Sequence, residues 1–156
     1  MVEPISKSEK REIVQSLIRG IRQDIEGYKQ LKSLLKCQRE LMQRRDNQGL
    51  QQHNEQQSNL CQRLMLKANE RSQMLVKLGF AGDINGMHAL IERLPKASSV
   101  QAALLWDNLL SLVKESKHAN EANGKLLIGQ QEVINQLLQG DKQQSIDYGD
   151  PRGQSV

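Results

Sequence analysis

Aromatic residues are scarce in this chain, and proline and cysteine are nearly absent. Phe, Trp and Tyr together make up 3% of the 156 residues, and there are three Pro and two Cys. So few aromatic side chains disfavour a β-rich core, whereas the abundant Leu, Gln, Lys, Arg and Glu favour long helices with aliphatic seams. The hydrophobic content of 37% and charged content of 26% are typical of a folded domain. We therefore expect a single all-α domain.

The sequence also lacks a long apolar run. No stretch approaches the ~20 consecutive apolar residues that a membrane helix needs. The start, Met1-Val2-Glu3-Pro4, leads into a charged segment instead of the apolar core of a signal peptide. These absences predict a cytoplasmic protein with no direct membrane insertion.

Recognisable catalytic and metal-binding motifs are missing as well. Cys37 and Cys61 have no Cys-x-x-Cys spacing and no nearby His, so we expect reduced, partly buried thiols. His53 has no His, Asp or Cys at matching helical spacing, which favours a semi-exposed seam residue over a ligand or base. No Gly-rich phosphate loop follows a strand, and no His-Glu-x-x-His motif occurs. We predict a protein that is not an enzyme and that uses no cofactor or metal.

The strongest pattern lies between Ser98 and Gln139, where apolar and small residues alternate at intervals of three and four. The members of this seam are Ala102, Leu105, Leu109, Leu112, Ser116, Ala119, Asn123, Leu126, Gln130, Val133 and Leu137. A second stripe, displaced by one residue, comprises Trp106, Leu110, Val113, Asn120, Gly124, Leu127, Ile134 and Leu138. A helical face this wide predicts burial deep in a bundle or a surface kept for a partner. We expect Trp106 in the core or an interface, with its indole N–H reaching water or an acceptor.

Three more helices are expected before this one. Ser6-x-x-Glu9 can form a capping box, and the three-four period that follows predicts a first helix of roughly 38 residues. The seam of this helix comprises Val14, Ile18, Ile21, Ile25, Tyr28, Leu31, Leu35, Gln38 and Met42. Turn-forming residues near Gly49 then predict a reversal into an antiparallel second helix over about Leu50 to Leu78. Its seam comprises Leu50, His53, Gln57, Leu60, Leu64, Ala68, Leu75 and Leu78, and Gly79 or Gly82 should supply the left-handed residue at its end. A short third helix over about Asp83 to Leu94 should close the hydrophobic end of the bundle.

A second capping box, Ser98-x-x-Gln101, is expected to begin the fourth helix. The composite prediction is an all-α, elongated antiparallel helical bundle of long helices with one short connecting helix. This bundle should span residues 1–140, and residues 141–156, which lack periodicity and are rich in turn formers, should form a flexible C-terminal tail.

The net charge of +4 comes from the first part of the chain. Residues 1–46 carry 11 Lys or Arg against 7 acids, and the remainder is balanced. A solvated helix face explains this surplus, because the basic residues lack the clustering and aromatic interleaving of a nucleic-acid surface. We expect no nucleic-acid partner.

The seam of the fourth helix is half polar between Ser116 and Gln130, where Asn123 and Gln130 occupy positions that ordinarily bury Leu or Ile. One interpretation is that small residues allow close helix approach while Asn123 fixes the register. Another is that this half of the helix is lightly covered and presents Leu127, Ile134 and Leu138 to an amphipathic client segment. The two interpretations are compatible.

The segment Asn120-x-x-Asn123-Gly124-x-Leu126-Leu127-x-x-Gln130, followed by Tyr148-Gly149, closely resembles the C-terminal region of FlgN-like flagellar export chaperones. Within the second helix, Glu70-Arg71-Ser72-Gln73-Met74-Leu75-Val76-Lys77-Leu78 is similar to that family's Glu-Lys-x-x-Leu-Leu-x-x-Leu run, with Arg71 where Lys is usual. The tail departs from the family's Tyr-Gly-x-x-Gly pattern, because three residues separate Gly149 from Gly153.

The resemblance implies a cytoplasmic chaperone for type III export. Such a protein binds the C-terminal helices of flagellar hook-associated proteins, keeps them unassembled and delivers them to the cytoplasmic domain of the membrane export gate. The residues that the resemblance assigns to client binding are Asn120, Asn123, Gly124, Leu127, Gln131, Ile134 and Leu138, and those assigned to export-gate docking are Tyr148 and Gly149.

Two other functions stay open at this point. The seams are compatible with a structural coiled-coil scaffold that associates only with copies of itself, and the basic first helix is compatible with nucleic-acid binding. A monomer is favoured, and a break in the fourth helix near Gly124 is neither predicted nor excluded.

Overall fold

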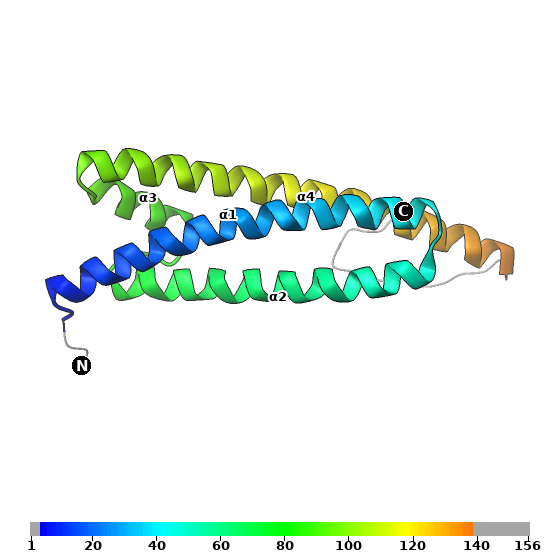
Figure 1. The fold of residues 1–156 in the computed structure, drawn as a ribbon, viewed down its shortest axis with the longest axis horizontal. Coiled ribbons are helices and arrows are strands. Elements are labelled where there is room, and N and C mark those ends of the chain that lie inside the picture. Colours follow the sequence, from blue (N-terminus) through cyan, green and yellow to red (C-terminus); the bar gives the residue numbers. More distant parts are fainter. Residues whose placement is uncertain (1–3, 139–156) are drawn as a thin grey trace.

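The computed structural model describes the backbone of residues 4–138 and the side chains of residues 4–125. This part of the chain forms four helices and no strand: α1 Lys7–Gln43, α2 Asn47–Lys77, α3 Ile84–Arg93 and α4 Lys96–Leu138. α1 and α2 form an antiparallel hairpin, and α4 packs back along it, parallel to α1 (Figure 1). The predicted all-α elongated bundle is confirmed. The predicted tail, residues 141–156, lies outside the described residues.

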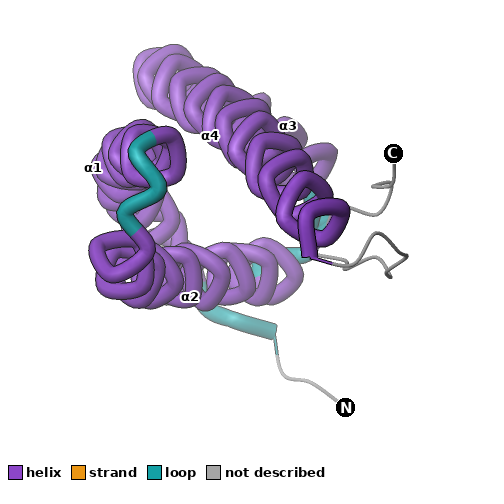
Figure 2. Tube along the Cα trace, turned by 90° about the vertical axis from the view of Figure 1, so that its right-hand side faces the viewer, coloured by secondary structure: helices purple, strands orange, loops and turns teal. Residues whose placement is uncertain are grey.

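α1 is the central element of the bundle. It packs along both α2 and α4 (Figure 2), and within the described residues no part of the α2 backbone lies close to that of α4. α3 bridges α2 and α4 at one end, where the larger core lies. The side chains buried most completely there are Leu17 and Ile21 of α1, Met87 of α3 and Leu109 of α4.

A smaller apolar cluster joins the hairpin farther along. Its buried members are Leu31 and Leu35 of α1 with Leu60 and Leu64 of α2. Leu31, Leu35, Leu60 and Leu64 all belong to the seams expected from the sequence, so the three-four period identified the faces on which α1 and α2 meet.

The hairpin turn is closed without glycine at its left-handed position. Arg45 has φ 57°, its N–H donates to Met42 O over 3.1 Å, and the next N–H, of Asp46, donates to Leu41 O over 3.0 Å. This pair of bonds is a Schellman motif, which satisfies carbonyls at the end of α1. Asp46 then caps α2 by accepting from the N–H of Gly49 over 2.9 Å. One short segment therefore ends α1 and begins α2.

Two other predicted helix ends are confirmed. The hydroxyl of Ser6 accepts from the N–H of Glu9 over 3.1 Å and caps α1. Gly79, with φ 93°, takes the left-handed position after α2. Its N–H donates to Val76 O, and that of Phe80 donates to Leu75 O, which is again a Schellman motif.

The predicted start of α4 is wrong. The helix begins at Lys96, so Ser98 lies inside its first turn and does not act as a cap. The reason is that the carbonyl of Pro95 already accepts from the N–H of Ser99 over 2.8 Å. The hydroxyl of Ser99 donates to Ile91 O over 2.7 Å and ties α4 to the last turn of α3.

Three expectations about single side chains need correction. Cys37 and Cys61 are free but exposed, because both fall outside the seams on which the hairpin packs. His53 is buried rather than semi-exposed, since its Nε2–H donates to Leu34 O over 2.7 Å. Trp106 is buried as expected, yet its indole N–H has no hydrogen-bond partner within the described part of the chain.

Candidate functional site

Two polar members of the α4 seam, Ser116 and Asn123, are buried in the bundle. Each is 4% exposed, between the apolar Ala102 at 2% and Leu112 at 8% of the same seam. The Nδ2 of Asn123 donates to Leu35 O over 2.9 Å and to Gln38 Oε1 over 3.0 Å. A buried amide with two partners on α1 holds α4 at one setting along that helix, which supports the register interpretation.

The helix surface around this amide is more open. Asn120 is exposed and Gly124 is half-buried. A Cβ added at Gly124 would meet no atom within 4 Å, so this glycine is not required by a close approach of α4 to its neighbours. α4 nevertheless continues through Gly124 without a break to Leu138.

The terminal segment of α4, residues 126–138, begins beside the last turn of α1 and passes the end of the α1–α2 hairpin at about residue 130 (Figure 1). Asn123 lies level with Leu35 and Gln38, and α1 ends at Gln43, whereas α4 continues to Leu138. At 1.5 Å per residue, α4 therefore reaches about 10–15 Å beyond the end of α1. Four of the predicted client-binding residues lie in the terminal segment: Leu127, Gln131, Ile134 and Leu138.

The side chains of the terminal segment lie outside the described residues, as do Tyr148 and Gly149 entirely. The structure thus brings Asn120, Asn123 and Gly124 together on one stretch of α4 and places the backbone of the other four client-binding residues directly after them. The predicted docking residues stay a prediction.

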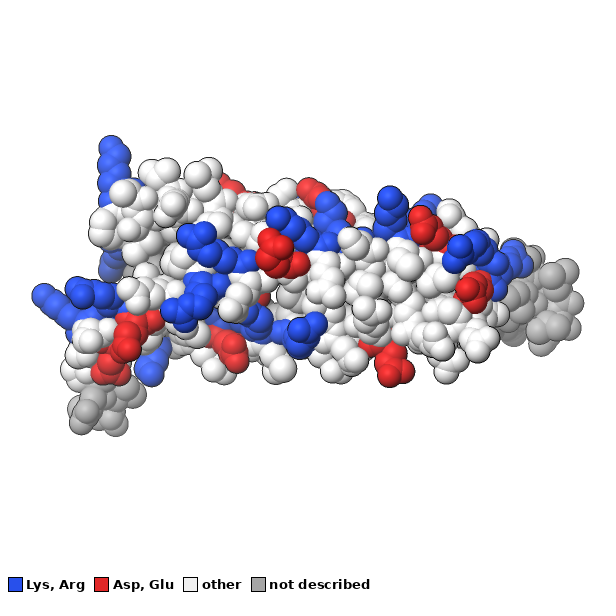
Figure 3. Space-filling model, viewed as in Figure 1, with Lys and Arg blue, Asp and Glu red and all other residues white. Residues whose placement is uncertain are grey.

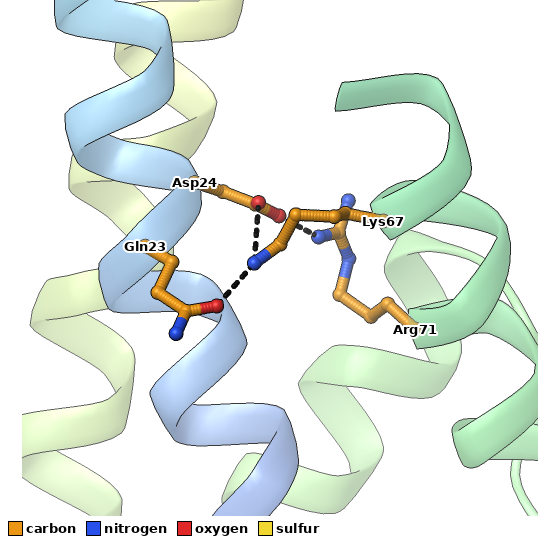
Figure 4. A network of polar contacts seen from close by, with 4 residues as sticks. All are labelled: Gln23, Asp24, Lys67 and Arg71. Atoms are coloured by element: carbon orange, nitrogen blue, oxygen red, sulfur yellow. Dashed lines mark hydrogen bonds and ion pairs between the residues drawn. The ribbon is translucent and has the colours of Figure 1, made fainter. Parts of the chain in front are cut away.

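Sequence analysis missed a buried charge network between α1 and α2. Asp24 is 2% exposed, and Arg71 Nη1 donates to its Oδ2 over 2.6 Å. Lys67 Nζ lies 3.6 Å from its Oδ1 and also donates to Gln23 (Figure 4). The one indication of this burial in the sequence is the position of Asp24, which falls between Ile21 and Ile25 on the apolar stripe of α1.

The network joins three helices. Both carboxylate oxygens of Asp24 face a cation, Oδ2 through the short bond to Arg71 and Oδ1 through the longer ion pair with Lys67. The guanidinium of Arg71 also lies over the ring of Trp106, 5.4 Å from its centroid. This cation–π contact connects α2 to α4 and completes a chain of contacts from Asp24 through Arg71 to Trp106 across three helices.

Two groups elsewhere have displaced pKa values. Burial raises the pKa of the Tyr28 phenol above its usual 10.0, and the charge of Arg71 opposes part of that rise. A hydrogen bond and ion pair from Lys32 of α1 lower the pKa of Glu115 of α4. Neither group belongs to the predicted client site.

Among the described residues, no group of three or more His, Cys, Asp or Glu is placed to hold a metal ion. No helix in the described range combines the length and apolar character required to cross a bilayer.

Comparison with known families gives one match. A model of the FlgN protein family matches residues 13–155, a range that includes nearly all of α1, the other three helices and the predicted docking residues. No curated protein matches the chain significantly. No solved structure does either.

Proposed function

The chain belongs to the FlgN family, and from this membership we propose that it is the export chaperone of flagellar hook-associated proteins. Membership supports a role as a flagellar export chaperone in general. The proposal goes further: the protein binds the C-terminal helices of hook-associated proteins in the cytoplasm and keeps them unassembled. It then delivers them to the cytoplasmic domain of the membrane export gate and carries out no bond chemistry.

The observation that carries this proposal is the reach of α4 beyond the hairpin. A helix that extends beyond its neighbours offers a surface on which an amphipathic client helix can lie. Apolar residues at intervals of three and four on the extending helix serve as anchors. The sequence of the terminal segment supplies such residues at Leu127, Ile134 and Leu138. Gln131 lies among them and adds a polar contact.

The residues before the terminal segment complete the client site. Asn120 is exposed on α4, and Gly124 leaves open space where a side chain would stand. Asn123 contributes by holding α4 on α1 where the client surface begins. The client helix would then continue the bundle beyond the point where α1 and α2 stop.

Delivery is assigned to Tyr148 and Gly149 by family resemblance. A tyrosine in a polar segment can enter a pocket while only a few residues become ordered, which gives the weak and reversible docking that cargo transfer requires. We expect Tyr148→Ala to leave client affinity unchanged and to stop export. Normal export by this variant would refute the docking role, and Tyr148→Phe serves as the conservative control.

Client binding is tested by a double substitution in the terminal segment. Leu127→Asp with Ile134→Asp should abolish co-purification with a hook-associated protein, while circular dichroism shows unchanged helical content. The matched control is Met65→Asp with Leu66→Asp on α2, because both residues are more than 60% exposed and lie far from the proposed site. Retained binding by the first variant, or equal loss by the control, would contradict the proposal.

A self-associating scaffold is the second candidate. The exposed Met65 and Leu66 on α2 favour it, because large apolar side chains on an outer face can seal a contact between copies. A scaffold should have the mass of a stable dimer or larger oligomer by light scattering, with α4 covered. A chaperone should instead take up one client helix at a defined ratio, and the favoured free state is a monomer.

A further inference from the structure

A groove of about 730 Å³ lies between the first half of α1 and the junction of α3 with α4. Apolar side chains form its floor: Val14, Ile18, Leu94, Ala102 and Leu105. Basic side chains from one helix form its rim: Lys10, Arg11, Arg19 and Arg22. No acidic residue lines it. Basic side chains also predominate on the visible surface at the end of the molecule where α1 begins (Figure 3).

The four rim cations are exposed and form no ion pair within the described residues. Other exposed cations of α1, among them Lys36 and Arg39, also form no ion pair within the described part of the chain, but they do not line the groove. The basic surplus of the N-terminal part of the chain is therefore only partly a solvated face. Four of its members surround an apolar groove and have no acid to neutralise them.

The arrangement along α1 is ordered. Lys10 and Arg11 precede the apolar pair Val14 and Ile18, and Arg19 and Arg22 follow. An occupant that lies along the groove would therefore meet cations at both ends and apolar contact between them. Residues 10–22 span about 18 Å, which is the length of a helix of about three turns.

We propose that this groove binds an acidic amphipathic helix of a partner protein. Apolar side chains at intervals of three and four would rest on the floor, and Asp or Glu at the flanks would pair with the rim cations. A nucleic acid would satisfy the cations but leave the apolar floor uncovered, so the floor favours a peptide.

The groove lies near the opposite end of α1 from the terminal segment of α4. The two surfaces share no residue, so a client on α4 and a partner in the groove can be bound at the same time. This inference does not depend on the proposed client site, and either can fail while the other holds.

The probe is a synthetic peptide of about 18 residues with Leu at intervals of three and four and Glu at most other positions. The comparator has the same composition in an order that gives no apolar face. Fluorescence anisotropy with the full chain should show saturable binding of the first peptide, weakened by salt, and none of the second. Equal binding of both peptides, or tighter binding of a 20-base-pair DNA duplex, would overturn the proposal.

Variants locate the binding. Arg11→Glu with Arg22→Glu should weaken binding of the amphipathic peptide by at least about tenfold. Lys36→Glu with Arg39→Glu is the matched control, because it makes the same change of charge at exposed positions of α1 outside the groove. The control should change affinity by less than about twofold. An equal loss in both double variants would show nonspecific charge attraction and refute the groove.

The apolar floor is tested separately. Val14→Ser leaves the charge unchanged and should weaken binding of the peptide by about fivefold, because the valine methyl groups no longer contact the apolar face of the peptide. Hydrogen exchange provides a second readout that needs no variant: the peptide should protect the amides of residues 10–22 and 94–105. Undiminished affinity of Val14→Ser, or protection confined to other regions, would overturn the assignment.

Discussion

Asn123 of α4 donates a hydrogen bond from its Nδ2 to the backbone oxygen of Leu35 on α1 over 2.9 Å, although 88 residues separate them in the sequence. The amide is buried, and its second bond goes to Gln38 on the same helix. Because both bonds form at only one setting of the two helices, this contact fixes how far α4 extends past the hairpin.

Asn123→Ala should lower the free energy of unfolding by about 1 kcal/mol, because two buried hydrogen bonds are lost. Asn123→Leu should restore stability through apolar burial but release the register, and so lower client binding. Urea unfolding followed by circular dichroism measures the first effect, and co-purification measures the second. Asn120→Ala, at an exposed neighbour, should change the free energy of unfolding by less than about 0.5 kcal/mol. If Asn120→Ala and Asn123→Ala lowered the free energy of unfolding equally, the role of Asn123 would be refuted.

Gly20 and Gly27 of α1 should respond oppositely to replacement by alanine. A Cβ at Gly20 would meet no atom within 4 Å, so Gly20→Ala should raise the free energy of unfolding by about 1 kcal/mol. A Cβ at Gly27 would lie 2.8 Å from Leu64 Cδ2, and Leu64 is enclosed in the smaller cluster. Overpacking should cancel or exceed the gain there.

Thermal unfolding of the two glycine variants compares these effects within one helix. Gly27→Ala combined with Leu64→Val, which lacks the Cδ2 methyl, should be more stable than the sum of the two single changes predicts. Equal stabilisation by Gly20→Ala and Gly27→Ala would show that α1 and α2 are not as close at Gly27 as the structure places them.

Asp24→Ala should lower the free energy of unfolding by about 3 kcal/mol, because it leaves Arg71 partly buried without its carboxylate. Asp24→Leu with Arg71→Met should recover most of that loss, since the guanidinium is removed together with its carboxylate and only the more exposed Lys67 loses a partner. The comparison pair is Glu26 and Lys29, which is exposed, and Glu26→Ala should cost less than about 0.5 kcal/mol. Chemical denaturation checks all three, and a loss for Asp24→Ala no larger than that for Glu26→Ala would refute the network.

Alkaline pH should weaken the fold through Tyr28. Its pKa is raised above 10.0 in the folded state by burial, so the folded chain holds the phenolic proton more tightly than the unfolded chain. This contribution to stability is complete below pH 10 and is lost as the pH rises through the folded-state pKa. Urea unfolding across this range should show that the free energy of unfolding falls less at alkaline pH for Tyr28→Phe than for the parent. Identical falls would be inconsistent with a buried phenol.

Much of the fold follows from the period of the apolar residues. The four helices, the capping by Ser6 and the left-handed Gly79 follow from local patterns that tertiary contacts do not override. The start of α4 does not, because the Pro95 carbonyl, three residues before the predicted cap Ser98, receives the first helical bond.

Features that depend on two helices at once were not predictable. Burial of Asp24 requires Arg71, 47 residues away, and a period analysis counts an isolated acid as solvent-facing. The groove exists only because α4 begins beside α1, so its basic rim appeared in the sequence as a scattered surplus. The proposed client-binding segment was predicted from its residues, but its reach past the hairpin follows from the pairing of Asn123 with α1.

The short turn at Arg45 also sets an order of assembly. The hydrogen bond between Gln38 and Asn54 across this turn joins residues 16 positions apart in the sequence. The hydrogen bond between Asn123 and Leu35 joins residues 88 positions apart. Closing the smaller loop costs less chain entropy, so the hairpin forms early and α4 docks onto it as a late step. Pulsed hydrogen exchange during refolding should therefore protect the middle of α1 and α2 before α4, and a nascent chain would complete α4 last.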